Sequence, residues 1–359
     1  MKKILLSVFA VAALASCFQN EDIVSTSDNN AIKFDSYVGN TTKAIDPSLN
    51  NSKINECTLY VWGTTQQNVD GAATVSIFEG VEVSKATGVW KYADEHTAYW
   101  IDGNIYNFAA VVNGTVTGVD NGLPKTISYT TQNLEDQLDL LYAEAKDIKG
   151  EDKGNVDGKV AFTFDHLLSK AVFSFENTTP APATGVAPQV ISTVSNVRIK
   201  GLSSSGVYTV GADWGTTNTS LTENFGDIVA ADANQVITDN PAQIAEQGKG
   251  KSNYERLLIP GTYSVEVICT IKLYLNGAVD NNNLAHEYKD HKITVNNLKL
   301  EPGHSYNFAL SAGLNDQILF NVTRVNGWEN GNTHDSDDDD TVNDHYPVPT
   351  PEPTPGQGN

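Results

Sequence analysis

The sequence has few cysteines, few basic residues and a single long apolar run. Its 359 residues include 3 Cys and 1 Met, and 23 Lys and Arg face 44 Asp and Glu, so the net charge is −21. So acidic a surface repels phosphate backbones, and we expect no nucleic-acid partner. Beyond its N-terminal segment, the chain has no run of about 20 apolar residues that could cross a membrane.

The apolar run lies at the N-terminus, where two lysines precede Ile4–Ala15. A run of this length is too short to span a bilayer and is typical of a secretory signal. The stretch that ends in Ala15, Ser16 and Cys17 resembles the lipobox of bacterial lipoproteins. The resemblance implies that residues 1–16 form a signal peptide and that Cys17 is acylated and anchors the protein in the outer membrane. The alternative is an ordinary signal peptide with an incidental cysteine.

Residues 17–30 are polar, and we interpret them as a tether between the lipid and the folded chain. The tether contains the acidic pair Glu21 and Asp22. This pair resembles the signal that sends lipoproteins of some Gram-negative anaerobes to the cell surface. We therefore expect the protein at the outer membrane or the cell surface.

The other two cysteines, Cys57 and Cys269, lie in strand-like segments. Successive side chains of a strand alternate between its faces, which groups each cysteine with apolar neighbours. Export permits a disulfide, but the two cysteines fall in different predicted domains. We therefore predict two buried free thiols.

The rest of the chain reads as an all-β protein, because its short apolar runs alternate with turn residues. Strands are predicted over 32–38, 58–62, 74–78, 98–100, 105–112, 126–129, 161–164, 171–175, 194–200, 206–210, 255–259, 263–275, 291–295, 305–310 and 318–325. Their spacing favours two β-sandwiches in tandem over parallel α/β units. We place the first sandwich at residues 31–158 and the second at 159–330.

Three segments read differently. Residues 134–145 are ambiguous, because their leucines have helix-compatible spacing while the flanking segments look extended. Residues 248–252 (GKGKS) resemble the end of a phosphate-binding loop but lack its leading glycine, and we interpret them as a basic flexible loop. Residues 331–359 combine an acidic run with proline at every second position from Pro347, which predicts a disordered, extended tail.

Three stretches together resemble the fimbrillin-like proteins that build type V pili. The first runs from Trp90 to Phe108, with Tyr99, Trp100 and Tyr106 between them; the second contains DLLYA (139–143) and FDHLLSK (164–170), and the third contains GHSYNF (303–308) followed by Trp328. Their shared order, behind a lipobox, covers residues 30–330.

The resemblance implies two transthyretin-like sandwiches that assemble by strand exchange with other pilus subunits. In that family a protease cuts after a basic residue behind the first strand, which leaves and is replaced by a strand of another subunit. Carried onto this chain, the removable strand has Ile32, Phe34 and Val38 on its apolar side, and Lys43 is the candidate cleavage residue. The alternative for Lys43 is a solvated loop lysine. Added strands gain main-chain hydrogen bonds and buried side chains.

The chain departs from the family pattern at two places. A strictly arginine-specific protease would leave Lys43 intact. Stalk subunits need an alternating apolar donor segment near the C-terminus, whereas this tail is acidic and proline-rich. Unless residues 318–325 detach, we expect an accessory, tip or terminal role.

Motifs for catalysis and metal binding are incomplete. His286, Glu287 and His291 are spaced one residue too widely for a zinc helix, and the acidic residues from Asp335 lack the glycine and the final glutamate of a calcium loop. His166 has no nucleophile or carboxylate identifiable in sequence, and a packed or boundary histidine is the preferred interpretation. We therefore predict no enzyme, no cofactor and no metal site.

The aromatic residues Trp90, Tyr99 and Trp100 are candidates for stacking on a sugar ring, although such residues more often belong to a sandwich core. They define the competing hypothesis, a surface-anchored lipoprotein that binds a host glycan or protein and does not polymerise. The leading hypothesis remains a structural or adhesive pilus component.

Overall fold

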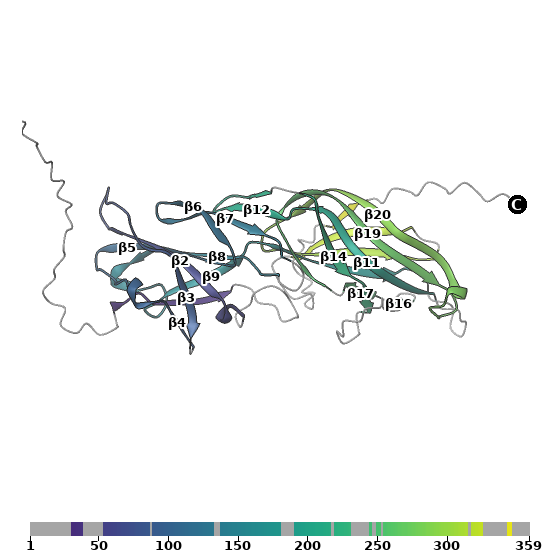
Figure 1. Cartoon of the computed structure of the whole chain (residues 1–359), viewed down its shortest axis with the longest axis horizontal. Helices are drawn as coiled ribbons and strands as arrows, with labels where there is room; N and C mark the ends of the chain where they lie inside the picture. The colour runs from purple at the N-terminus through teal and green to yellow at the C-terminus, as the bar shows by residue number, and fades with distance from the viewer. Residues whose placement is uncertain are drawn as a thin grey trace, which may run out of the picture.

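The structure is a computed structural model that describes residues 30–38, 53–86, 88–132, 137–180, 190–216, 219–230, 244–245, 249–252, 254–314, 317–325 and 343–346. It is an elongated assembly of β-sheets, with the early strands at one end and the late strands at the other (Figure 1). The helical segments of the described residues are single 3-10 turns, such as Lys53–Glu56 and Asn281–Asn283. None of these described helices could span a membrane. The predicted all-β class is confirmed.

The N-terminal sheet has the strand order β1-β9-β8-β5-β2-β3-β4. Its members are β1 (Phe34–Val38), β2 (Thr58–Gln67), β3 (Val75–Ala86), β4 (Val89–Lys91), β5 (Asn104–Val112), β8 (Leu141–Lys149) and β9 (Val160–His166). The ambiguous segment 134–145 thus enters a strand, β8, while residues 133–136 lie outside the described residues. Strand β9 lies after the predicted domain boundary at 158/159, yet it pairs with β1 and β8 of the N-terminal sheet. The division into domains stays a prediction.

A small sheet joins the two ends of the molecule. Its order is β13-β12-β7-β6, from the strands β6 (Thr115–Asp120), β7 (Leu123–Thr130), β12 (Ser205–Thr209) and β13 (Trp214–Thr216). Strands β7 and β12 are far apart in sequence and pair antiparallel, with Ser205 opposite Thr130 and Thr209 opposite Thr126. Figure 1 shows them side by side above the junction. The two ends are therefore joined by main-chain hydrogen bonds as well as by the covalent chain.

Two sheets form the C-terminal end. One has the order β15-β17-β10-β21-β22-β23, with β18 also on β10; the other has the order β14-β11-β19-β20, with β16 on β11. Their members are β10 (Ser169–Asn177), β11 (Ile191–Leu202), β14 (Leu221–Gly226), β15 (Ile228–Ala230), β16 (Ile244–Ala245), β17 (Lys249–Ser252), β18 (Arg256–Leu258), β19 (Gly261–Tyr274), β20 (Leu284–Leu300), β21 (Ser305–Ala312), β22 (Leu319–Val325) and β23 (Asn343–Tyr346).

One of these strands corrects a sequence prediction, and another lies within the segment predicted to be a tail. The basic segment predicted as a flexible loop forms β17, in which Gly250 and Ser252 are buried while Lys249 and Lys251 are exposed. The predicted disordered tail contains β23, which pairs antiparallel with β22 at the edge of its sheet and ends before Pro347. The rest of the tail lies outside the described residues.

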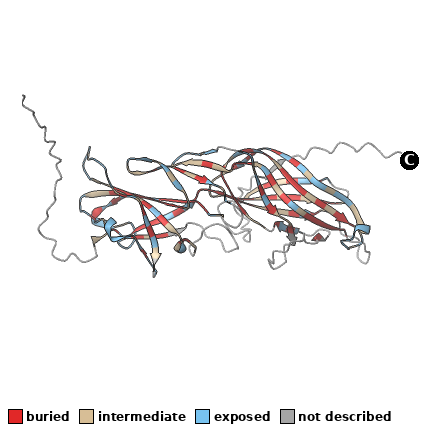
Figure 2. Ribbon diagram, viewed as in Figure 1, coloured by how far each residue is buried: buried red, intermediate tan, exposed pale blue. Residues whose placement is uncertain are grey.

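Apolar residues of alternating strand positions fill three cores, one at each end and one at the junction. Strand β19 shows the pattern, with Val265 and Val267 buried and Glu266 between them half-buried. Figure 2 shows the buried positions along the facing strands of the C-terminal end. The junction core takes residues from both ends, among them Tyr129, Leu167 and Ile259.

Two tyrosines brace the chain where it enters a core strand. Before β21, the Glu301 N–H donates to the Tyr306 hydroxyl (2.8 Å); before β5, the Ile101 N–H donates to the Tyr106 hydroxyl (2.8 Å). At the first of these corners Gly303 has φ of 69°, a left-handed conformation that glycine adopts without strain.

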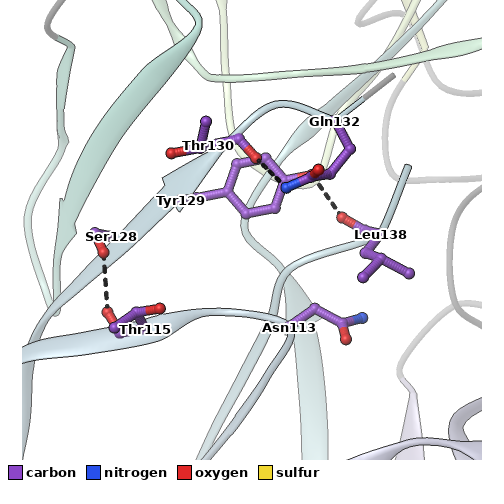
Figure 3. A pocket seen from close by; sticks show the side chains of 7 residues that line it. All are labelled: Asn113, Thr115, Ser128, Tyr129, Thr130, Gln132 and Leu138. Carbon is purple, nitrogen blue, oxygen red and sulfur yellow. Dashed lines mark hydrogen bonds between the residues drawn. The ribbon is translucent and has the colours of Figure 1, made fainter. Parts of the chain in front are cut away.

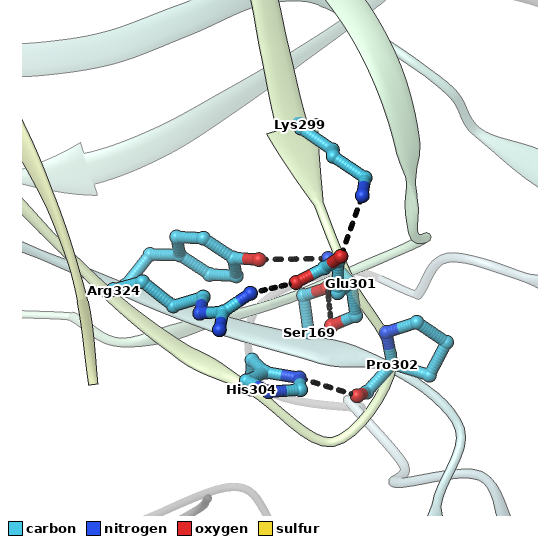
Figure 4. A network of polar contacts seen from close by, with 7 residues as sticks. Ser169, Lys299, Glu301, Pro302, His304 and Arg324 are labelled. Atoms are coloured by element: carbon cyan, nitrogen blue, oxygen red, sulfur yellow. Dashed lines mark hydrogen bonds and ion pairs between the residues drawn. The ribbon is translucent and has the colours of Figure 1, made fainter. Parts of the chain in front are cut away.

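The corner before β21 is further held by a polar network (Figure 4). The Glu301 carboxylate accepts from Lys299 (2.6 Å) and from Arg324, and the Glu301 carbonyl accepts from the Ser169 hydroxyl (2.8 Å). The hydrogen bond from Lys299, together with the charges of Arg324 and His304, lowers the pKa of Glu301. These contacts tie the β20–β21 turn to the first residue of β10.

Candidate functional site at the edge strand β1

Strand β1 is the edge of the N-terminal sheet. It pairs in parallel with β9, from Phe34 opposite Val160 to Val38 opposite Phe164, and within the described residues this is its only strand partner. The chain just before β1 is held by the segment 98–100, through the bonds Ile32 N–H to Ala98 O (2.9 Å) and Trp100 N–H to Asn30 O (3.0 Å). An edge strand of this kind can leave without breaking a second ladder.

The core face of β1 is closely packed. Ile32 and Phe34 are 1% and 3% exposed, which confirms that both point into the core. The Phe34 ring contacts four aromatic rings at centroid distances of 5.4 to 6.0 Å, those of Phe78, Tyr92, Phe108 and Phe162. Burial of one such side chain stabilises by about 1.5–3 kcal/mol, so Ile32 and Phe34 together contribute about 3–6 kcal/mol. Removing β1 would therefore leave an apolar groove.

The outer face of β1 contributes little. Asp35 forms an ion pair with Lys159 (3.1 Å) in which both side chains are more than 40% exposed, and pairs of this kind contribute about 0–1 kcal/mol. The hydroxyl of Tyr92 donates to the Ile32 carbonyl (2.7 Å), and burial raises the pKa of Tyr92. The strand is thus held mainly by its core face and the β9 ladder.

Three predicted site residues fall wholly or partly outside the described residues. Val38 belongs to β1, but its side chain is not described; Lys43 and Cys17 lie in segments that are not described. The removable strand, the cleavage residue and the lipidation residue remain predictions.

The candidate stacking aromatics lie beside β1, but two of them are core residues. Trp90 and Trp100 are 6% and 3% exposed, whereas Tyr99 is 54% exposed. The Trp100 ring meets the Tyr106 ring edge to face at 4.7 Å. A buried ring cannot stack on a sugar without leaving the core, so the burial of both tryptophans favours the core alternative and leaves Tyr99 as the accessible candidate.

The sequence analysis missed the partner of His166. Its Nδ1 atom lies 2.6 Å from Asp139 Oδ2, and both side chains are almost fully buried. These are the first residue of DLLYA and the histidine of FDHLLSK, so the two parts of the family signature meet in space. The Nζ atom of Lys170, in the same signature, lies 3.9 Å from Glu255 Oε2. Burial keeps the His166–Asp139 pair from any substrate, and its place at the end of β9 makes it a brace of the junction.

Both cysteines of the described residues are free, as predicted. Cys269 is fully buried, and burial raises the pKa of its thiol to about 12. Cys57 is only half-buried, which corrects the prediction of a buried residue; burial again raises its pKa. A raised pKa leaves little thiolate at neutral pH, so neither residue suits nucleophilic catalysis.

A polar hollow of about 270 Å³ lies beside β7 (Figure 3). It is lined by Asn113, Thr115, Ser128, Tyr129, Thr130, Gln132 and Leu138. Several of its polar groups already bond within the chain, including Tyr129 to the Leu138 carbonyl (2.6 Å) and Gln132 to the Thr130 carbonyl (3.3 Å). The lining has hydroxyl groups but no Asp, Glu, His or Lys side chain that could activate them as a general base.

A second hollow of about 290 Å³ lies at the junction and contains the ion pair of Arg256 with Glu223. Both side chains are buried, and burial lowers the pKa of Arg256 to about 10. In the described part of the chain, no group of three or more His, Cys, Asp or Glu side chains could hold a metal ion. The lining of the first hollow has no His, Cys, Asp or Glu, and that of the second has only Glu223, so neither hollow is a candidate metal site.

Comparison with known proteins identifies the family. The family model described as fimbrillin-like matches residues 42–328, which is most of the chain. The chain therefore belongs to the fimbrillin-like family. Membership makes it a pilus-related protein of the cell surface. No curated protein matches the chain.

Three solved structures illustrate what the chain is similar to. A fimbrial protein from Bacteroides vulgatus is 14% identical with a TM-score of 0.61, over 83% of this chain and 99% of that one. A fimbrial assembly protein from Parabacteroides distasonis is 12% identical (TM-score 0.36; 81% and 94% covered). The fimbrial anchor protein Mfa2 from Porphyromonas gingivalis is 13% identical (TM-score 0.31; 83% and 97% covered). The first of these similarities shows the fold.

Proposed function

We propose that this chain is a non-enzymatic pilus component that joins other subunits by strand exchange. In this proposal β1 leaves the N-terminal sheet, and a strand of another subunit fills the groove and pairs with β9. The observation that carries the proposal is the position of β1, an edge strand with one ladder and a deeply packed core face. A replacement strand restores both the ladder and the apolar contacts.

Release of β1 requires a cut in the chain that follows it. Lys43 lies five residues beyond the end of β1, in a segment rich in turn-forming and polar residues. We propose that a protease cuts after Lys43, following export as a lipoprotein anchored to the outer membrane through Cys17.

The C-terminal end supports a role as acceptor of a strand. Strand β22, the remaining candidate donor, pairs with β21 on one side and β23 on the other, and its residues Phe320 and Val322 are buried. A strand so integrated does not detach without opening the C-terminal core. We therefore propose an accessory, tip or terminal position in the pilus.

Limited proteolysis tests the proposal. Low-dose trypsin on the folded protein should release a fragment that ends at Lys43, and the remaining body should form complexes with pilus subunits that resist detergent but not heat. The matched control is Lys43→Gln, which should retain the fragment. Mass spectrometry identifies the cut, and gel electrophoresis with and without heating identifies the complexes. A fragment that stays bound after cleavage, with no such complexes, contradicts strand exchange.

A binding module that does not polymerise is the second candidate, favoured by the exposed ring of Tyr99. Binding to a carbohydrate array that Tyr99→Ala abolishes would support it. Trp100→Ala is unsuitable for this test because it would open a cavity in the core and cost about 3–5 kcal/mol.

A further inference from the structure

One residue on the core face of β1 is polar. Ile32, Phe34 and Ser36 alternate into the core, and Ser36 is 9% exposed. Its backbone N–H donates to Asp35 Oδ1 (2.9 Å). Its side-chain Oγ is buried and has no hydrogen-bond partner among the described residues. A buried hydroxyl that loses its water without gaining a partner destabilises the strand that carries it.

The neighbour of Ser36 in the ladder is apolar. Ser36 is paired with Phe162, whose ring is fully buried. The parallel ladder at the other end of the molecule differs at the comparable place, where Phe173 of β10 is paired with the buried Phe308 of β21. The core-facing residues of β10 around it, Ala171 and Phe175, are also apolar. Strand β10, which has neighbours on both sides, thus has a phenylalanine opposite a buried ring, whereas the edge strand β1 has a serine at the comparable place.

We propose that Ser36 weakens β1 in its groove, so that an incoming strand with a branched aliphatic side chain at this register displaces it. The partner class is therefore a pilus subunit whose donated strand has valine, isoleucine or leucine opposite Phe162. Such a side chain removes the unpaired hydroxyl and adds apolar burial at the same site. This inference rests on the proposed strand exchange, and it adds the residue that gives the exchange its direction.

Hydrogen exchange of the uncut, full-length chain tests the strand before any cleavage occurs. Ser36→Val should slow exchange of the amides of β1 about tenfold, a change of about 1.4 kcal/mol in the opening free energy. Ser36→Ala should slow it by a smaller factor, because it removes the hydroxyl without adding bulk. Ser36→Thr is the matched control: it has the shape of valine but keeps a hydroxyl, so its exchange should stay near the wild-type rate. Amides of β10 should be unchanged in all three variants.

Two results overturn the inference. The first is that the amides of β1 exchange at the wild-type rate in both Ser36→Val and Ser36→Ala. The second is that Ser36→Thr slows their exchange as much as Ser36→Val does. If valine is too large for the site, Ser36→Ala still tests the inference, because it removes the hydroxyl without adding volume. The trypsin experiment is read separately. If the wild-type fragment never leaves but Ser36→Val slows exchange, the proposed function fails while the weakness of β1 stands. If the fragment leaves at the same rate from wild type and Ser36→Val, strand exchange stands and the role of Ser36 fails.

A competition experiment then addresses the partner. A synthetic peptide of residues 30–38 with valine in place of Ser36 should displace the clipped strand about tenfold more effectively than the unchanged peptide. Displacement is measured by mass spectrometry of the retained fragment. Equal displacement by the two peptides contradicts the preference for an aliphatic side chain.

Discussion

Strands β1 and β10 each form a parallel ladder, but their surroundings differ. Strand β1 has β9 on one side, whereas β10 pairs with β21 on one side and with β17 and β18 on the other. Both place a buried phenylalanine in an aromatic cluster, Phe34 in one and Phe173 in the other. Burial therefore does not distinguish the two strands; they differ in the number of ladders, one for β1 and three for β10.

The largest expected effect tests this difference directly. Phe173→Ala should lower the free energy of unfolding by about 3–5 kcal/mol. The substitution leaves a cavity in the core, and β10 is hydrogen-bonded to strands on both sides, so it cannot easily shift to fill that cavity. Phe34→Ala should cost less in global unfolding, since β1 can open locally, and should instead speed hydrogen exchange in β1. Urea denaturation and hydrogen exchange measure the two effects. Equal global losses would remove the distinction between the strands.

The buried pair at the junction gives the next effect. Asp139→Ala leaves His166 without its carboxylate, and we expect a loss of about 2–3 kcal/mol in the free energy of unfolding. The matched control is Asp120→Ala, which breaks an exposed ion pair with Lys125 and should cost less than about 1 kcal/mol. Similar losses in the two variants would contradict a bracing role.

The C-terminal core should weaken in alkali. The thiol of Cys269 has a pKa of about 12 when folded, against an ordinary value of 9.0. Because the folded pKa is the higher, the unfolded chain loses this proton first, and the stabilising effect of the neutral thiol disappears as pH rises from about 9 to about 12. The loss should reach about 1 kcal/mol near pH 10. Cys269→Ala should flatten this dependence in urea titrations, and an unchanged slope would contradict it.

The smallest effect concerns the outer face of β1. Asp35→Asn removes the exposed pair with Lys159 and should change the free energy of unfolding by about 0.5 kcal/mol, less at high salt. A loss above about 2 kcal/mol would mean that charge, rather than the core face, holds the strand.

Alternation along the chain predicted most long strands, because residues such as Val265 and Val267 show their period of two directly. It failed where pairing rather than side chains defines the strand. Strand β17 has no apolar residue in its sequence KGKS, and it exists through its ladders with β10 and β15.

The candidate site was predictable only in part. Ile32 and Phe34 follow from alternation, but the burial of Ser36 depends on which strands close over it. The pairing of Asp139 with His166 spans 27 positions in the sequence and follows from the fold. The only sequence signal for this pairing was that Asp139 and His166 both belong to one family signature.

The small sheet at the junction has a mechanical consequence. Strands β7 and β12 run along the length of the molecule and come from opposite ends of it (Figure 1). Tension applied between the two ends loads their hydrogen bonds together in shear, in addition to the peptide link between β9 and β10. A fibre that contains this chain would therefore resist stretching at this junction more than a fibre whose domains are joined by a peptide linker alone.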